Sequence, residues 1–251
     1  MALLYILSFV ILSVMLFISA QVIRMRMGRS LAEAENSSLR IGRIENFGSV
    51  TSLSITPLID FHAPAGYDSE EGVSYLVRAD DTTILFDLGY NKKGEHPSPL
   101  VRNMERMNIA PCGIDIIFIS HAHMDHVGGR DAESGGEFML SAGPVKLREI
   151  PAYAPPGISA SGNNPDVRVV TVKEPAVIGE GIASIGVYSR SLFLIGYTTE
   201  HALAVNVKGK GIVLVAGCGH QGIGAIIERA KQLFDEPIYG IIGGLHLPVN
   251  G

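Results

Sequence analysis

Four residues that can bind metal lie within six positions of one segment, Ser120–Gly129. His121, His123 and His126 offer imidazole nitrogen and Asp125 offers carboxylate oxygen, which are donors that zinc accepts. Side chains two positions apart on an extended segment point the same way, so His121 and His123 can bind one ion together. Asp125 and His126 follow where the chain turns, and can face a second ion. A polar turn after a strand is the alternative, but this density of donors predicts a metal site.

The elements around this motif place it at the end of a buried strand. Residues 114–119 form an apolar run that is typical of a strand in the interior of a sheet. Gly128 and Gly129 allow a tight bend into a predicted helix that ends near Gly135. Loops that converge at strand ends often carry functional residues, so we expect the metal ligands to gather at one edge of a sheet.

The rest of the folded part is predicted to alternate short strands with a few helices. The predicted strands cover residues 51–59, 73–78, 82–86, 145–150, 167–172, 183–188, 202–207, 212–216 and 238–242, and the predicted helices cover residues 98–108 and 222–234. The turn at residues 208–211 joins two of these strands in a hairpin. This mixture predicts an α+β layered architecture.

The first 23 residues contain no charged side chain and consist mostly of large apolar residues. A helix of this length spans the hydrocarbon core of a membrane, about 30 Å, at about 1.5 Å per residue. Arg24, Arg26 and Arg29 follow at once, and positive charge gathers on the cytoplasmic side of membrane helices. A cleaved signal peptide with its exit at Ile18–Ala20 is the alternative, but the start carries no Lys or Arg.

We therefore expect a single-pass membrane protein with its catalytic domain in the cytoplasm. The expected organisation is a transmembrane anchor at residues 1–23, a juxtamembrane helix or linker at 24–49 and a folded domain at 50–251. Cys112 and Cys218 are too few for a disulfide framework, which is compatible with a reducing compartment. The net charge of −5 without a basic block argues against general nucleic-acid binding. The expected partners are a small-molecule substrate and, through the N-terminal helix, the membrane.

Three further segments accompany the histidine motif and the strand that ends at Phe86–Gly89. They are Glu200–Leu203, Ala216–Gly222 and Gly243–His246. Together with the His-x-His-x-Asp-His motif they resemble the metallo-β-lactamase superfamily over roughly residues 50–247. Within it they look like the subgroup of 7,8-dihydropterin-6-methyl-4-(β-D-ribofuranosyl)aminobenzene 5′-phosphate synthase and its bacterial relatives. The resemblance implies a four-layer αββα sandwich with a dinuclear metal site at one edge.

The resemblance also implies which residues hold the two ions. The first ion would be held by His121, His123 and His220, and the second by Asp125, His126 and His246. Asp87 would orient a histidine through a hydrogen bond, with a turn-forming Asp as the alternative. Elsewhere in the superfamily an Asp at the position of Cys218 bridges both ions. A Cys218 thiolate could ligate, but this residue could equally be a small buried hydrophobe.

The motifs do not determine the role of His201 or the extent of the C-terminal part of the fold. His201, beside Glu200, is a candidate catalytic or substrate-contacting residue, with a hydrogen-bonded structural histidine as the alternative. Relatives in the subgroup continue well past the Gly-Gly-Leu-His segment, whereas this sequence stops at Gly251. We therefore expect the sandwich to be C-terminally incomplete.

The motif and the resemblance together predict a metallohydrolase that acts on an ester, a lactone or a phosphoester. The expected cofactors are two divalent ions, with zinc as the first choice and manganese or iron as alternatives, because mixed nitrogen and oxygen ligands tolerate several metals. The ions would activate a water, and Asp125 would orient it. The alternatives are a transferase like the dihydropterin synthase and a metal-binding protein without turnover.

Overall fold

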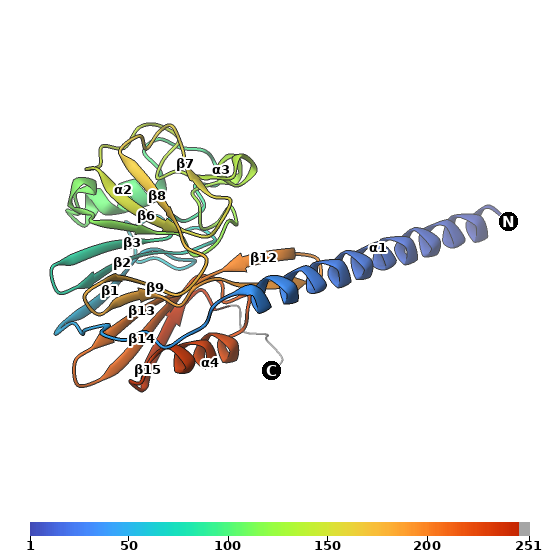
Figure 1. The fold of residues 1–251 in the computed structure, drawn as a ribbon. Coiled ribbons are helices and arrows are strands. Elements are labelled where there is room, and N and C mark those ends of the chain that lie inside the picture. Colours follow the sequence, from blue (N-terminus) through green and yellow to red (C-terminus); the bar gives the residue numbers. More distant parts are fainter. Residues whose placement is uncertain (246–251) are drawn as a thin grey trace.

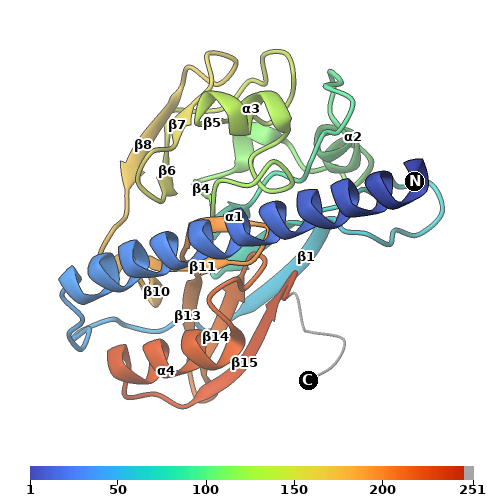
Figure 2. The same ribbon diagram turned by 90° about the vertical axis from the view of Figure 1, so that its right-hand side faces the viewer.

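The computed structural model describes residues 1–245 of the chain, and His246, one of the expected ligands, lies outside the described residues. Two sheets lie face to face with helices on their outer faces, and a long N-terminal helix projects from the assembly (Figure 1). Figure 2 shows the same helix crossing in front of the sheet edges. The α+β class that we expected is confirmed.

Within residues 1–245, the first sheet has six strands in the order β1-β2-β3-β4-β6-β8. These are β1 (Leu53–Ile59), β2 (Ser74–Ala79), β3 (Thr82–Phe86), β4 (Ile116–Phe118), β6 (Ile150–Ala154) and β8 (Val167–Thr171). The second sheet has five strands in the order β15-β14-β13-β10-β9. These are β9 (Ala176–Gly179), β10 (Ile182–Ser184), β13 (Leu203–Val207), β14 (Gly211–Ala216) and β15 (Ile238–Gly243). Two smaller pairs join β11 (Tyr188–Leu192) to β12 (Gly196–Glu200) and β5 (Glu137–Phe138) to β7 (Ser159–Ala160).

The space between the two sheets is filled by apolar side chains from both. Tyr75, Phe86 and Phe118 from the first sheet pack in one cluster with Val205 and Val215 from the second. Each of the five is 3% exposed or less, so the two sheets share one continuous core. Removing this apolar surface from water is the main force that holds the sheets together.

Helices cover the outer face of each sheet. The first sheet is covered by α2 (Pro99–Arg106) and α3 (Arg130–Gly135), with Leu100 and Met104 of α2 fully buried against it. The second sheet is covered by α4 (Ile223–Leu233), which buries Ile226 and Leu233. A short 3₁₀ helix, η1 (Pro111–Gly113), precedes β4. The order helix, sheet, sheet, helix is the layered arrangement that we expected (Figure 1).

Two of the strands predicted from sequence are wrong in extent. Residues 145–149 lie outside any strand, and Val145 and Leu147 are buried there because they pack as loop side chains against the first core. The run predicted at 183–188 is split between β10 and β11. The chain bends between them at Gly186, which has φ +74 and lies so close to Pro175 that a Cβ would sit 2.6 Å from its nitrogen.

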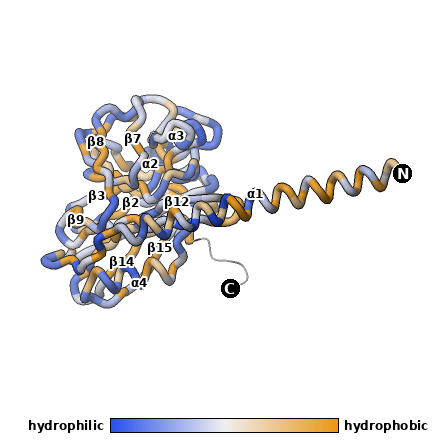
Figure 3. Tube along the Cα trace, turned by 45° about the vertical axis from the view of Figure 1, so that its right-hand side comes forward, coloured by the Kyte–Doolittle hydropathy of each residue, from blue (hydrophilic) through white to orange (hydrophobic). Residues whose placement is uncertain are grey.

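The N-terminal helix α1 (Ala2–Ser38) runs without a break from the expected anchor into residues 24–38 of the stretch that we expected to be a juxtamembrane helix or linker. Its segment Leu4–Ser38 is long and apolar enough to cross a membrane, and the most apolar window of that segment is 0% buried. Figure 3 shows the apolar residues concentrated in the half of α1 that projects away from the domain. The other half packs on β11, where Asn36 Nδ2 donates to the Ser189 carbonyl over 2.8 Å and Asn36 Oδ1 accepts from the Ser189 amide over 2.9 Å.

The segment after α1 packs on the folded domain before Val50 is reached. Phe47 is 5% exposed, and its ring stacks on Phe234 with the centroids 4.7 Å apart. The Ile44 amide donates to the Leu233 carbonyl over 2.9 Å. These contacts attach residues 44–47 to the end of α4, so this part of the expected linker is packed structure.

Candidate metal centre

The strand pairing brings the first two candidate segments to one edge of the sheet. β3 and β4 are parallel neighbours, and Phe86 pairs with Phe118 in their register. Parallel strands end on the same side, so the residues that follow them, Asp87 and Ser120, come together. Asp87 is fully buried and has φ +52, a left-handed conformation that Asp tolerates better than most residues. The backbone bend turns its side chain under the histidine motif.

Asp87 receives three hydrogen bonds from the motif. Oδ1 accepts from the Ser120 amide over 2.7 Å, and Oδ2 accepts from the Ser120 hydroxyl over 2.6 Å. Oδ2 also lies 2.6 Å from Nδ1 of His126, which donates to it. The sequence predicted an orienting carboxylate at this position, and the structure places Asp87 in hydrogen-bond contact with a motif histidine.

These contacts determine which nitrogen of each ring carries the proton. A carboxylate only accepts, so the single hydroxyl proton of Ser120 goes to Asp87. The Ser120 oxygen then accepts from Nδ1 of His121, which lies 2.9 Å away. His126 likewise uses its Nδ1–H for Asp87. In their neutral forms, both imidazoles therefore present Nε2 with its lone pair on the side away from Asp87, which is the form that binds metal.

One group of three histidines lies where the first ion was expected. The ligand atoms of His121, His123 and His220 all lie within 4.8 Å of one another. Nδ1 of His123 and Nε2 of His220 are 3.1 Å apart. His220 comes from the loop after β14, almost a hundred residues along the chain from the motif. The structure thus brings together the three residues that the resemblance assigned to one ion.

A second group adjoins the first and includes the cysteine. The ligand atoms of His121, His126 and Cys218 also lie within 4.8 Å of one another, and all three residues are buried. Cys218 Sγ is 3.0 Å from Nε2 of His126, and Asp125 Oδ2 is 3.4 Å from the same nitrogen. Of the expected second set, the structure therefore brings His126 and Asp125 together, with Cys218 beside them.

The charges around this edge favour a cation. Burial opposes the charged form of His126, yet Asp87, Cys218 and Asp125 together raise its pKa well above the usual value. Burial likewise raises the pKa of Asp125, but the contact with His126 outweighs it and holds that pKa at about 2. Burial raises the pKa of the Cys218 thiol. Surroundings that favour a positive charge at His126 also suit a metal ion, so the residues present fit a divalent cation.

Glu200 holds the loop that carries His220, and the sequence analysis did not assign it a role. Its two carboxylate oxygens accept from the backbone amides of Gly219 and His220 over 2.8 and 2.7 Å. Burial raises the pKa of Glu200 to about 7, although both amide contacts work against that rise. The position of Glu200 immediately before His201 did not indicate this contact, because the two amides belong to the loop after β14, about twenty residues further along the chain.

The structure does not bring His201 to the metal-binding groups. Its Nε2 donates to the Ile119 carbonyl over 2.8 Å, and its Nδ1 lies 2.8 Å from the Ser184 hydroxyl. The ring is fully buried and stacks on Phe118 with the centroids 4.2 Å apart. Burial lowers the pKa of His201 to about 4. Since both nitrogens are used inside the core, the catalytic interpretation is not supported, and the structural alternative describes this residue.

Gly217 allows the two halves of the site to approach each other. A Cβ at this position would lie 2.2 Å from the Ser120 hydroxyl oxygen and 3.1 Å from Oε1 of Glu200. Any larger residue would displace the hydroxyl that connects Asp87 to His121. The glycine before Cys218 is therefore required by the close packing of the loop after β14 on the histidine motif.

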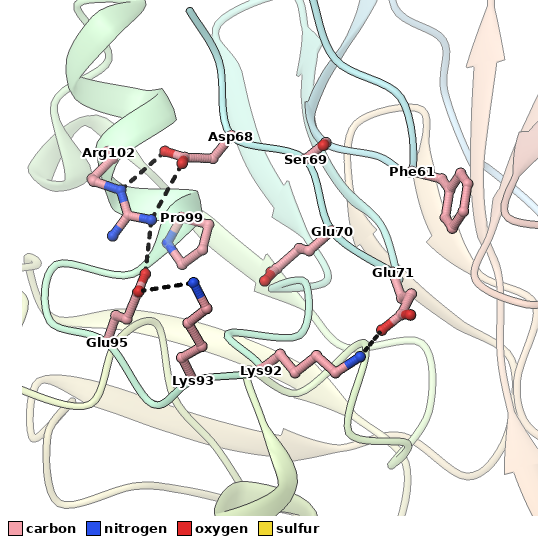
Figure 4. Close-up of a pocket in the computed structure, with 10 residues that line it drawn as sticks. All are labelled: Phe61, Asp68, Ser69, Glu70, Glu71, Lys92, Lys93, Glu95, Pro99 and Arg102. Atoms are coloured by element: carbon pink, nitrogen blue, oxygen red, sulfur yellow. Dashed lines mark hydrogen bonds and ion pairs between the residues drawn. The ribbon is translucent and has the colours of Figure 1, made fainter.

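A cavity of about 420 Å³ lies between the loop that follows β1 and the segment that leads into α2 (Figure 4). It is lined by Phe61, Asp68, Ser69, Glu70, Glu71, Lys92, Lys93, Glu95, Pro99 and Arg102. Its wall residue Glu71 precedes Gly72, whose Cβ would lie 2.1 Å from the Asp125 carbonyl oxygen. The cavity is charged, with Arg102 paired to Asp68 and Glu95 (Figure 4). None of its lining residues belongs to the two metal-binding groups.

The chain is similar in sequence and in fold to known proteins. The chain is 26% identical to the 7,8-dihydropterin-6-methyl-4-(β-D-ribofuranosyl)-aminobenzene-5′-phosphate synthase of Methanocaldococcus jannaschii, with 80% of each chain covered. It is 27% identical to an uncharacterized protein of the same organism, over 76% of this chain and 78% of that one. The crystal structure of Tm1679, a metal-dependent hydrolase of the β-lactamase superfamily, superposes with a TM-score of 0.57 at 23% identity, covering 80% of this chain and 79% of that one. The sequence profile of the metallo-β-lactamase superfamily matches residues 68–218, and the resemblance predicted from the motifs is thereby confirmed. The chain belongs to the metallo-β-lactamase superfamily.

Proposed function

We propose that this protein is a metal-dependent hydrolase that acts on an ester, a lactone or a phosphoester. The observation that carries the proposal is the pair of adjoining ligand groups, which share His121 and lie at the end of β4. Asp87 holds Nδ1 of His126 directly and Nδ1 of His121 through the Ser120 hydroxyl, so the Nε2 side of each ring faces away from Asp87. Preset donors lower the cost of ordering a metal site, and this supports a binding role for the whole cluster.

The proposed cofactors are two divalent ions, with zinc favoured over manganese and iron. His121, His123 and His220 would hold one ion, and His126 and Asp125 would hold the other together with His246, as the resemblance implies, and with the Cys218 thiolate. Imidazole nitrogen and thiolate sulfur both suit zinc, whereas manganese prefers oxygen ligands. When bound, such ions supply Lewis-acid activation of water and stabilise negative charge that develops on the substrate.

The side chains around the ligands would divide the remaining work. Asp125 is held as a carboxylate, because its contact with His126 keeps its pKa at about 2. From that position it can accept a hydrogen bond from the attacking water and fix the direction of attack. Glu200 keeps the His220 loop in place through two backbone amides. The cavity of about 420 Å³ between the loop after β1 and the segment before α2 has mixed charges, which would suit a polar or ionic part of a substrate.

We also propose that α1 anchors the enzyme in a membrane with the catalytic domain on the cytoplasmic side. An exposed apolar stretch of this length is long enough to cross a bilayer. Arg24, Arg26 and Arg29 follow it directly, which supports the cytoplasmic orientation.

A transferase reaction is the second candidate function, and it is supported by the match to the dihydropterin synthase over 80% of both chains. A third candidate, a metal-binding protein without turnover, makes no use of the charged cavity. The three differ in what metal-loaded protein does with small molecules. Hydrolysis of phosphodiester, ester or lactone probes favours the first, binding of a pterin favours the second, and stoichiometric metal without either favours the third.

The test compares full-length protein with the double variant His121→Ala, His123→Ala. We expect hydrolysis of at least one probe class by the metal-loaded protein and loss of both metal and hydrolysis in the variant. A His62→Ala, His96→Ala variant is the matched control, because both side chains are exposed and lie outside the two groups. Full turnover by the metal-free double variant would contradict the proposal.

A further inference from the structure

The hairpin of β11 and β12 ends in three large apolar residues. Leu192 pairs with Gly196, so Phe193, Leu194 and Ile195 form the loop between the strands. Their side chains are 45, 59 and 48% exposed. Turns normally use Gly, Asn, Asp or Ser, yet Leu194 occupies a left-handed conformation with φ +72. Three adjacent exposed apolar residues, one of them in the unfavourable left-handed conformation, indicate a surface that contacts something other than water.

The hairpin lies along α1 and points toward its N-terminal, apolar half. A Cβ on Gly28 would lie 2.4 Å from the Ser191 hydroxyl, so Ser191 packs directly against Gly28. A Cβ on Gly196 would lie 2.7 Å from the guanidinium of Arg24, one helical turn nearer the N-terminus. The hairpin therefore advances along α1 from Gly28 to Arg24 as it approaches its tip, and Figure 1 shows β12 beside this part of the helix.

The tip consequently lies where the apolar part of α1 ends. Residues 4–20 of the helix are exposed, whereas Gln21 and Val22 are partly covered. The first charged residue of the helix is Arg24, which lies against Gly196. A helix that crosses a bilayer leaves the hydrocarbon at such a boundary, so the tip is level with the membrane interface.

The charges near the tip are those that an anionic lipid surface attracts. Arg24, Arg26 and Arg29 lie on the turns of α1 just beyond the apolar stretch. Basic side chains beside a membrane helix are attracted to the anionic headgroups of the adjacent leaflet. An apolar tip flanked by basic residues suits a bilayer surface better than a second protein.

We propose that the β11–β12 hairpin is a second membrane contact, which inserts Phe193, Leu194 and Ile195 into the interface of the bilayer that α1 spans. This rests on the proposed membrane anchor. The contact has a consequence for the metal centre, because Nη1 of Arg190 donates to the carbonyls of His220 and Gln221 over 3.2 and 3.1 Å. The same hairpin therefore connects the bilayer surface to the loop that carries a proposed ligand.

The test uses the absence of tryptophan from the chain, which makes a single introduced tryptophan an unambiguous reporter. Full-length Phe193→Trp is reconstituted in phosphatidylcholine–phosphatidylglycerol vesicles with or without brominated acyl chains, which quench nearby tryptophan. Ile195→Trp is the second reporter, in case the first disturbs the turn. Tyr239→Trp is the matched control, because Tyr239 is 60% exposed and lies at the end of β15 away from the metal-binding edge. Phe9→Trp reports on α1.

We expect Phe193→Trp and Ile195→Trp to be blue-shifted and to lose most of their emission in brominated vesicles, as Phe9→Trp does, while Tyr239→Trp keeps its emission. Quenching of Phe9→Trp alone would overturn the hairpin contact and leave the anchor in place. A blue-shifted tip reporter that brominated lipid does not quench would show that protein covers the tip, which also overturns the proposal. Absence of quenching at Phe9→Trp would overturn the anchor and the inference together.

Discussion

Asp87 Oδ2 lies 2.6 Å from Nδ1 of His126, and the same oxygen accepts the hydroxyl proton of Ser120. Through that hydroxyl the carboxylate also determines the protonated nitrogen of His121, which lies 2.9 Å from the Ser120 oxygen. One buried side chain thus sets the proton position on two rings in the two adjoining ligand groups. The ring orientation exists before metal arrives, and this accounts for the density of hydrogen bonds beneath the motif.

Replacing this carboxylate should weaken metal binding without removing a ligand. In Asp87→Asn one of the two oxygens becomes an amide donor, so the side chain can no longer accept all three hydrogen bonds from Ser120 and His126, and the rings can adopt the wrong tautomer. Loss of an orienting partner of this kind costs about 10–100-fold in metal affinity. Competition with a chromophoric chelator measures the loss, and Asp81→Asn, at an exposed turn position, is the control. Unchanged affinity in Asp87→Asn would show that the carboxylate does not orient the ligands.

Cys218 should ligate the second ion. Its sulfur is 3.0 Å from Nε2 of His126, close enough for both atoms to reach one cation. We expect cobalt-loaded protein to show thiolate-to-cobalt charge-transfer absorption that Cys218→Ser abolishes and Cys112→Ser retains. Cys112 is the other cysteine of the chain and is exposed, which makes it the matched control. Retention of the band in Cys218→Ser would assign the sulfur to packing alone.

Glu200 should act on the metal centre through the backbone of the His220 loop. In Glu200→Gln one carboxylate oxygen becomes an amide donor that faces a backbone N–H, which leaves a buried donor unsatisfied at a cost of about 1–3 kcal/mol. We expect lower zinc affinity and a broadened His220 resonance in NMR spectra, and no such change in Glu149→Gln, whose side chain is exposed. If metal affinity and the resonance both match the unmodified protein, the loop is held by other contacts.

His201 should make the fold sensitive to acid. Its pKa is about 4 in the folded chain, below the ordinary value of 6.5, so the unfolded chain binds more protons between these two values. The free energy of unfolding therefore falls as the pH drops from 6.5 to 4 and is not lowered further by this residue below 4. The full loss is about 3 kcal/mol at about 1.36 kcal/mol per pKa unit.

Denaturant unfolding in detergent at several pH values measures this loss, with His201→Gln as the test and the exposed His62→Gln as the control. We expect the pH dependence between 6.5 and 4 to be weaker in His201→Gln than in the unmodified chain and unchanged in His62→Gln. Equal slopes in all three proteins would show that the imidazole is not buried as a neutral group.

The site residues that could be predicted from the sequence are those that directly follow an apolar, strand-like run. The motif at His121–His126 follows an apolar strand, and Asp87 and His220 each follow another, so the strand ends alone indicated that they meet. Glu200 was missed because its partners are two backbone amides, which have no sequence signature. His201 has the same local setting as a strand-end ligand, and only the packing on Phe118 shows that its ring faces the core.

The sequence did not predict the contact between α1 and the β11–β12 hairpin. The apolar tip at Phe193–Ile195 lacks the turn residues that usually mark a hairpin, so the pattern of residues 188–200 did not predict one. The docking of Ser191 against Gly28 joins segments more than 160 positions apart, and no periodicity in either segment encodes it. The composition of residues 1–23 predicted their apolar character, whereas only the tertiary structure shows where the domain lies beside that helix.

The amount of zinc that each chain retains shows whether the histidine motif binds metal. Full-length protein is stripped with chelator, reloaded with zinc, freed of excess by gel filtration and analysed by mass spectrometry for metal per chain. We expect tightly bound zinc in the unmodified chain and in the His62→Ala, His96→Ala control, and its loss in His121→Ala, His123→Ala. Zinc in the unmodified chain no higher than in the His121→Ala, His123→Ala variant would contradict this expectation.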